Sequence, residues 1–322
     1  MIKRTVLTLL SAILCIGAGA QTVGLKDGKP EVTIFVPGLS EEIRLFVMSD
    51  THLFRSDSRE DPFRAYSERM AKAYNHTKHF QTGEQTEPES EFVRSLQIAK
   101  DFGADAVLHL GDLISYPSEY AMEWALDKLN ASGLPWFYIS GNHDWHYEGW
   151  PGTEKDIRDE FCKGRISPLF QGHDYLGYSV EIKGVKIILV NDGINGILPE
   201  QVKFLRKELA GRQPKILGIH IPVAAPGRRP ESWTIGSRAW GWDVDKGYSI
   251  ERRPRWPHEG HGQADYDFRD ALLKAGARGR LTAVICGHVH ERTTDIQAGI
   301  PFMTVSDNAS GGYLKLILRP QK

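Results

Sequence analysis

Short runs of apolar and β-branched residues recur along the chain, and most have the length of a β-strand. Several are apolar at every position, which is typical of strands covered on both faces of a sheet. The pattern predicts strands at residues 32–36, 43–49, 106–110, 136–140, 178–182, 185–191, 215–220, 282–287, 301–306 and 313–318.

Between these runs, apolar residues recur every three or four positions, as expected for helices that bury one face. The segment 199–211 also begins with Pro199 and ends with Gly211, the usual signals for the start and end of a helix. Helices are predicted at residues 62–74, 89–103, 118–133, 199–211 and 264–277. Alternating strands and helices indicate an α/β fold, and the hairpin-like stretch around Gly184 adds antiparallel strands. A sandwich of two mixed sheets flanked by helices fits this order.

Two segments interrupt the alternation. Residues 75–90 are polar and loop-like, and residues 222–262 are rich in Pro, Gly, Trp and Arg. Tryptophan-rich composition argues against disorder in the second segment, which we treat as an insertion in a single domain. One hypothesis is a lid over the site, whose arginines meet a substrate phosphate or carboxylate; the other is a packed surface excursion with solvated charges. The arginines in question are Arg228, Arg229, Arg238, Arg252, Arg253 and Arg255.

The N-terminus has the features of a secretory signal peptide. Lys3 and Arg4 precede an apolar run at residues 6–16, and small residues follow at 18–20. We expect cleavage after residue 20, export to the periplasm or the medium, and one domain at residues 21–322. The alternative is a membrane anchor, but the apolar run is short for a bilayer span, and none is expected after cleavage.

Composition narrows the function classes. The 322 residues are 41% hydrophobic, enough for a large core, and the net charge of −1 gives no sign of a nucleic-acid-binding surface. Cys162 and Cys286 remain after cleavage. Because Cys286 lies in an apolar run, we expect a buried free thiol rather than a disulfide.

Polar residues that can bind a metal follow five of the predicted strands. In open α/β sheets the carboxyl ends of the strands form the ligand site, so these side chains are expected to meet at one edge. Imidazole, carboxylate and carboxamide groups without a thiolate suit Fe, Zn or Mn, which predicts a centre with two such metal ions. The candidates are Asp50, His52, Asp112, Asn142, His143, Asp144, His220, His288 and His290.

These residues form five blocks, Asp-x-His, Gly-Asp, Gly-Asn-His-Asp, His and Gly-His-x-His, between residues 45 and 290. In this order the blocks resemble the signature of the calcineurin-like metallophosphoesterases. The resemblance implies a four-layer α/β/β/α sandwich that hydrolyses phosphoric monoesters or diesters. It also divides the ligands between the two metals. One ion would be held by Asp50, His52 and His290, the second by Asn142, His220 and His288, and Asp112 would bridge them.

The same resemblance implies catalytic roles for His143 and Asp144. Metal-bound hydroxide would attack phosphorus, and His143 would stabilise the phosphate charge and protonate the leaving oxygen. Asp144 would hold the His143 ring or raise its pKa. Two other polar residues match no block: Asp192 is expected to be a turn or capping residue, and His109 a core or ligand-supporting histidine.

Alternatives within and outside the enzyme class stay open. Purple acid phosphatases place a tyrosine ligand three residues after the bridging aspartate, where this chain has Ser115, with Tyr116 one position later. They also have a glycine where this chain has His52, so that branch is disfavoured, whereas a nucleotidase-like enzyme is not. A metal-containing scaffold that binds a phosphorylated partner has no need of an acid at position 143. The motifs do not distinguish a small-molecule phosphate ester from a macromolecular one.

Overall fold

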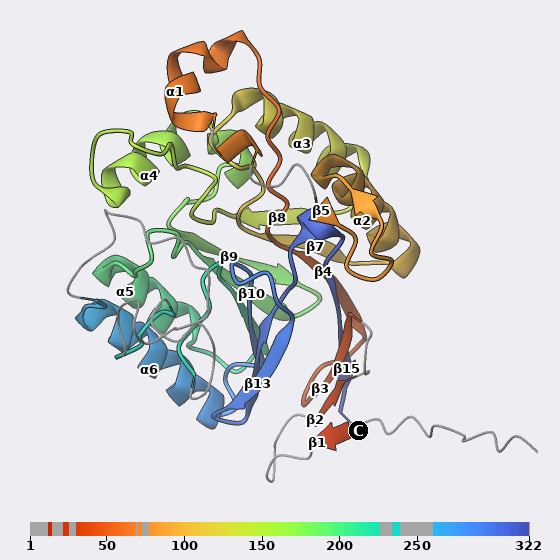
Figure 1. Ribbon diagram of the computed structural model, residues 1–322. Coiled ribbons are helices and arrows are strands. Elements are labelled where there is room, and N and C mark those ends of the chain that lie inside the picture. Colours follow the sequence, from red (N-terminus) through yellow and green to blue (C-terminus); the bar gives the residue numbers. More distant parts are fainter. Residues whose placement is uncertain are drawn as a thin grey trace, which may run out of the picture.

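The apolar runs form two large mixed β-sheets that lie between layers of helices (Figure 1). The computed structural model describes residues 12–14, 22–25, 30–68, 70–72, 77–225, 234–238 and 260–321. Most of the insertion, including all its arginines except Arg238, lies outside the described residues.

The first sheet has seven strands in the order β1-β2-β3-β15-β4-β7-β8. β4, β7 and β8 run parallel, and β15 pairs antiparallel with β4 and parallel with β3. The strands are β1 (Ala12–Leu14), β2 (Thr22–Leu25), β3 (Glu31–Val36), β15 (Leu314–Pro320), β4 (Ile43–Met48), β7 (Ala106–Leu110) and β8 (Trp136–Ile139).

The second sheet has six strands in the order β13-β14-β12-β11-β10-β9. Its four central strands are parallel, and the edge strands β13 and β9 pair antiparallel with their neighbours. The strands are β13 (Thr293–Gln297), β14 (Ile300–Thr304), β12 (Ala283–Cys286), β11 (Lys215–Gly218), β10 (Val185–Val190) and β9 (Gly177–Ile182). A separate short hairpin joins β5 (Thr77–Lys78) to β6 (Gln85–Thr86).

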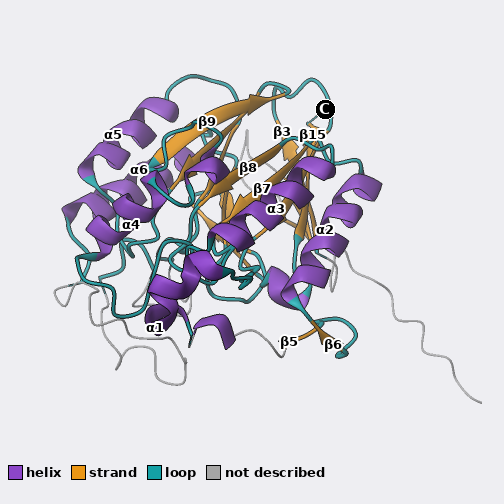
Figure 2. Ribbon diagram, turned by 90° about the horizontal axis from the view of Figure 1, so that it is seen from above, coloured by secondary structure: helices purple, strands orange, loops and turns teal. Residues whose placement is uncertain are grey.

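Side chains on alternate strand positions build three cores. Leu45 and Val47 of β4 pack between the two sheets, whereas Phe46 and Met48 face the helices over the first sheet. Those helices are α2 (Pro88–Phe102), α3 (Glu119–Ala131) and α4 (Glu154–Lys163), and Figure 2 shows α3 and α2 beside β7 and β8. The second sheet buries its outer face against α5 (Pro199–Glu208) and α6 (Gln263–Ala277). The predicted α/β/β/α sandwich is therefore confirmed.

Local signals explain where several helices begin and end. The Ser118 hydroxyl accepts a hydrogen bond from the Ala121 N–H at the start of α3. Helix α2 ends at Gly103, whose φ of 67° lies in the left-handed region. Both cysteines are buried and free, as expected.

The helix predicted at residues 62–74 is wrong. The chain instead forms a 3₁₀ turn at Ser58–Phe63, one helical turn at Arg64–Ser67 (α1) and another 3₁₀ turn at Met70–Lys72. Residues from elsewhere in the chain hold the two aromatic side chains: Phe63 stacks on Tyr147 with ring centroids 4.8 Å apart, and Tyr66 meets Trp150 at 5.2 Å. These tertiary contacts override the regular helical repeat.

The N-terminal prediction concerns residues that the structure describes only in part. Ala12–Leu14 pairs antiparallel with Thr22–Leu25 at the edge of the first sheet. Among the described residues, no helix has the length and apolar character needed to cross a membrane. The signal peptide itself stays a prediction.

Candidate metal centre

The candidate ligands come from both sheets and meet at the edge formed by the carboxyl ends of the strands. The first sheet supplies Asp50 and His52 after β4, Asp112 after β7, and the segment 142–144 after β8. The second sheet supplies His220 after β11 and the pair His288 and His290 after β12. Three groups of these side chains each bring one ligand atom per residue to within 4.8 Å of one another. The groups are Asp50, His52 and His290; Asp112, His220 and His288; and His52, Asp112 and His143.

The first group has the spacing of ligands around one ion. His290 Nε2 lies 3.3 Å from Asp50 Oδ1 and 3.3 Å from His52 Nε2, and the third side of the triangle is 3.9 Å. Tetrahedral ligands at metal–ligand distances of about 2.1 Å stand roughly 3.4 Å apart. Asp50 Oδ1 is also buried, and the ring nitrogens of His52 and His290 are the polar atoms beside it. The donor set and its spacing therefore fit a metal ion.

The second group is equally close-packed. His220 Nε2 lies 3.1 Å from Asp112 Oδ2 and 3.1 Å from Asn142 Oδ1. Its other ring nitrogen, Nδ1, lies 2.8 Å from the Leu110 carbonyl, which fixes the ring and points Nε2 into the site. Asp112 belongs to two of the three groups and thus lies between the two ends of the centre.

The backbone at the ligands is strained. Five candidate ligands have positive φ angles, although none is a glycine: Asp50 58°, His52 54°, Asp112 52°, His288 70° and His290 56°. Such conformations cost of order 1–3 kcal/mol each and persist only where the surrounding structure enforces them. Here the neighbouring loops enforce them, since the N–H groups at positions 50 and 52 donate to the carbonyls at 111 and 112. This concentration of strain marks a functional site.

Two glycines let the loops approach one another. A Cβ at Gly141 would overlap the Asp112 carboxylate, and a Cβ at Gly287 would overlap Ser49 and the Asp50 carboxylate. The glycines in the sequence blocks are therefore required by close packing around the ligands.

The charges of the site favour a cation. Burial by itself would raise the pKa of Asp50, but positive charge on His290 lowers it, and His220 acts in the same way on Asp112. Burial lowers the pKa of His52 to about 4 and that of His288 to about 3, so both are neutral ligands at neutral pH.

The two remaining histidines carry protons in a site without metal. Burial opposes this, but Asp112 raises the pKa of His220 to about 10, and Asp50 raises that of His290 to about 9. The two carboxylates thus stabilise positive charge where a metal ion would supply it.

His143 lies next to the candidate ligands. Its side chain is part-buried, its backbone N–H donates to Asp112 Oδ1 at 2.7 Å, and its ring meets the His52 ring edge-on at 4.9 Å. The imidazole is therefore beside the ligands and reachable from solvent.

Asp144 does not have the expected contact with the His143 ring. Its Oδ2 accepts hydrogen bonds from the N–H groups of Asp112 at 2.8 Å and Gly141 at 2.7 Å, and its Oδ1 accepts from Ile114 at 2.9 Å. The side chain lies between the loops after β7 and β8 because the three N–H groups there have no hydrogen-bond partner within a strand. Asp144 therefore joins the loops after β7 and β8.

Asp192 binds backbone N–H groups of a loop of the second sheet, as Asp144 does in the first sheet. It is fully buried at the end of β10 and accepts from the N–H groups of His220 at 3.0 Å and Ile221 at 3.1 Å. The expected capping role is correct, and the structure adds that the capped loop carries a candidate ligand.

Sequence reasoning missed Asn308. It is buried in the loop four residues after the end of β14, and its N–H donates to the Ser49 carbonyl at 2.8 Å. Its Oδ1 accepts from the Thr51 hydroxyl, whose oxygen also lies 2.8 Å from His109 Nε2. His109 is thus the supporting histidine that was expected, and the position of Asn308 after a strand was the available signal.

Tyr116 lies away from the centre. Its hydroxyl donates to the Phe54 carbonyl at 2.9 Å, and burial raises its pKa to about 12. The Ser115 hydroxyl donates to the His52 carbonyl. Neither supplies the tyrosinate ligand of purple acid phosphatases.

The described ends of the insertion pack against the second helical layer. Val223 bridges Ile235, and the Arg238 guanidinium lies 4.6 Å from the centre of the Tyr266 ring on α6. This one arginine thus contacts an aromatic ring, and the lid hypothesis rests on residues outside the described ranges.

The fold and the clustered ligands define a metal-dependent hydrolase built on an α/β/β/α sandwich. The sequence profile of the calcineurin-like phosphoesterase family matches residues 43–292, and the chain belongs to that family. Family membership makes it a metallophosphoesterase, a hydrolase of phosphoric esters that depends on a dinuclear metal centre.

Comparison with solved structures gives matches of low sequence identity. A dimetal phosphatase from Danio rerio is 11% identical, with a TM-score of 0.49 and coverage of 84% of this chain and 89% of that chain. A purple acid phosphatase from yellow lupin (Lupinus luteus) seeds is 15% identical, with a TM-score of 0.49 and coverage of 92% and 50%. A comparison with curated proteins finds no match.

Proposed function

We propose that the protein is an exported hydrolase of phosphoric esters that works with two transition metal ions, Fe, Zn or Mn. The observation that carries this proposal is the convergence of ligand atoms from both sheets, with Asp112 common to two of the groups. The substrate is a small-molecule or macromolecular phosphate ester.

The ligands divide into two sets in this proposal. Asp50, His52 and His290 would hold one ion, and Asn142, His220 and His288 would hold the other, with Asp112 shared between them. When bound, such a pair supplies Lewis-acid stabilisation of phosphate charge and lowers the pKa of water to near neutrality.

The protein itself orients the substrate and moves a proton. His143 is held against Asp112 by its backbone N–H, and the residue is only part-buried. In its protonated form the imidazole would face the phosphate and donate a proton to the leaving oxygen. The hydrogen bonds that Asp144 accepts would keep the loop carrying Asn142 and His143 in place.

The export part of the proposal rests on the N-terminal sequence. Lys3 and Arg4, the apolar run and the small residues before Gln21 support cleavage and secretion or release into the periplasm. Determining the N-terminus of protein recovered outside the cytoplasm tests it. A mature chain that still begins at residue 1 would count against it.

The activity is tested by assaying a panel of phosphate monoesters and diesters with protein loaded with Mn, Zn or Fe. His143→Ala is expected to keep both metals by elemental analysis and to lose about 10²–10⁴-fold in kcat. His173→Ala is a matched control, because this exposed histidine stacks on Tyr178 away from the ligands. Metal loss in His143→Ala would make His143 a ligand. Full metal content without turnover on any ester would favour the non-catalytic scaffold.

A further inference from the structure

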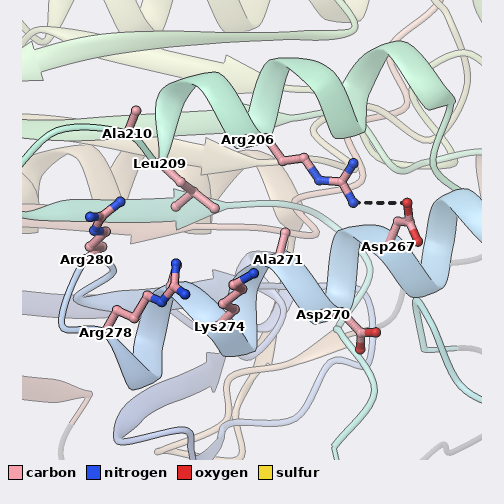
Figure 3. A pocket seen from close by; sticks show the side chains of 10 residues that line it. Arg206, Leu209, Ala210, Asp267, Asp270, Ala271, Lys274, Arg278 and Arg280 are labelled. Atoms are coloured by element: carbon pink, nitrogen blue, oxygen red, sulfur yellow. Dashed lines mark hydrogen bonds and ion pairs between the residues drawn. The ribbon is translucent and has the colours of Figure 1, made fainter.

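A cavity lies between the end of α5 and the neighbouring helix α6, with a volume of about 450 Å³ (Figure 3). Four cationic side chains line it: Arg206, Lys274, Arg278 and Arg280. Leu209 and small residues of both helices form its apolar wall. This size suits a small ligand.

Three of these cations have no counter-ion. Arg206 is paired with Asp267 at 3.0 Å, which joins the two helices at one end of the cavity. Within the described part of the chain, no carboxylate lies within ion-pair distance of Lys274, Arg278 or Arg280. Figure 3 shows the three charged groups on the same side of the cavity, with the two aspartates of the wall toward the other end. The part of the cavity lined by these three residues therefore carries an excess of positive charge.

The turn after α6 fixes the two arginines. The Ala275 carbonyl accepts from the N–H groups of both Arg278 and Arg280, and Gly279 between them has a φ of 63°. Because these hydrogen bonds hold the turn, the backbone positions from which the two arginine side chains extend are fixed. The positive charge of Arg280 also acts on the buried Lys215, whose pKa is lowered by burial first and then by the charges of Lys186 and Arg280.

The cavity is separate from the metal centre. Its lining residue Arg280 lies two positions before Thr282, whose N–H donates to the Lys215 carbonyl at the start of β11, whereas His220 follows the end of that strand. Five residues of extended chain span about 16 Å. A ligand here would leave the metal ligands untouched.

We propose that this cavity binds a small tetrahedral oxyanion, either inorganic phosphate or the phosphate group of a monoester. Guanidinium groups present paired N–H donors that match two oxygens of such a group, and the lysine adds a point charge. An extended polyanion fits poorly, because Asp267 and Asp270 would repel it at the other end. The inference does not depend on the proposed function.

Calorimetric titration of the metal-loaded protein with inorganic phosphate at low ionic strength tests the proposal. The wild type is expected to show a binding class, besides any at the metal centre, that weakens with salt. Arg278→Ala/Arg280→Ala is expected to weaken that class at least tenfold without changing turnover or melting temperature. Arg278→Lys/Arg280→Lys, which keeps the positive charges and loses the paired N–H donors of the guanidinium groups, is expected to bind with intermediate affinity.

Matched controls make the result decisive. Arg64→Ala/Arg94→Ala removes two exposed arginines from the other helical layer and is expected to bind phosphate like the wild type. Methylphosphonate stands in for a phosphate monoester and is expected to bind like phosphate, whereas malonate is a dianion whose two carboxylate groups are trigonal rather than tetrahedral. Equal binding by the wild type and the Arg278/Arg280 alanine variant would overturn the proposal. So would equal weakening in the control variant, or malonate binding as tightly as phosphate.

Discussion

Replacing Asp144 with alanine is expected to destabilise the protein, besides lowering its activity. The buried carboxylate accepts hydrogen bonds from the N–H groups of Asp112, Ile114 and Gly141, at 2.7–2.9 Å. A buried donor left without an acceptor costs about 1–3 kcal/mol, so three such donors cost roughly 3–9 kcal/mol. Because whole domains are stable by only about 5–15 kcal/mol, the variant should lose a large part of its stability.

Thermal unfolding followed by circular dichroism measures this loss on metal-loaded protein. At about 2 °C per kcal/mol, a loss of 3 kcal/mol lowers the melting temperature by about 6 °C. Asp144→Asn keeps one acceptor oxygen and should fall between the wild type and Asp144→Ala. Asp127→Ala is the control, since that exposed carboxylate pairs only with Lys128, and it should change stability by less than about 0.5 kcal/mol.

One outcome would refute this reasoning. Suppose that Asp144→Ala has the melting temperature of the wild type and that its turnover falls as far as that of His143→Ala. The Asp144 carboxylate would then act on the His143 imidazole. The expectation from the sequence motif would then be right, and the three N–H groups would have found other partners.

Three further results are expected. Removing metal with a chelator should abolish turnover and lower the melting temperature, since ligand at a hundredfold excess over Kd contributes about 2.7 kcal/mol; an unchanged calorimetric transition would count against the centre. Asp192→Ala should strand the N–H groups of His220 and Ile221 at a cost of roughly 2–6 kcal/mol and reduce metal content by elemental analysis, and full occupancy at an unchanged melting temperature would contradict this. Because burial raises the pKa of Cys162 to about 12 and Cys286 is also buried, a thiol reagent at pH 8 should label neither until denaturant is added, and rapid labelling of native protein would show the opposite.

Most strands of the two sheets were predictable because they are apolar runs of strand length, several of them apolar on both faces. Such runs identify strands without any knowledge of their partners, and the polar residues that follow them locate the edge where they meet. The edge strand β13, Thr293–Gln297, was missed because it is only partly buried and lacks an apolar run.

Helix α4 was also missed, although local signals were present. Thr153 and Asp156 form a capping box, and Ile157 and Phe161 lie one turn apart on the buried face. The roles of Asp144 and Asn308 were beyond local reasoning. Each depends on backbone groups from distant loops, and a sequence motif does not show which way a carboxylate or amide points.

The split of the ligands between the sheets bears on the order of events during folding. Each proposed ion would take ligands from both sheets, so a chain with only one sheet formed would offer an incomplete coordination set. Metal would then bind late in folding, after both sheets have formed and packed together. A chain exported in the unfolded state would acquire its ions after crossing the membrane.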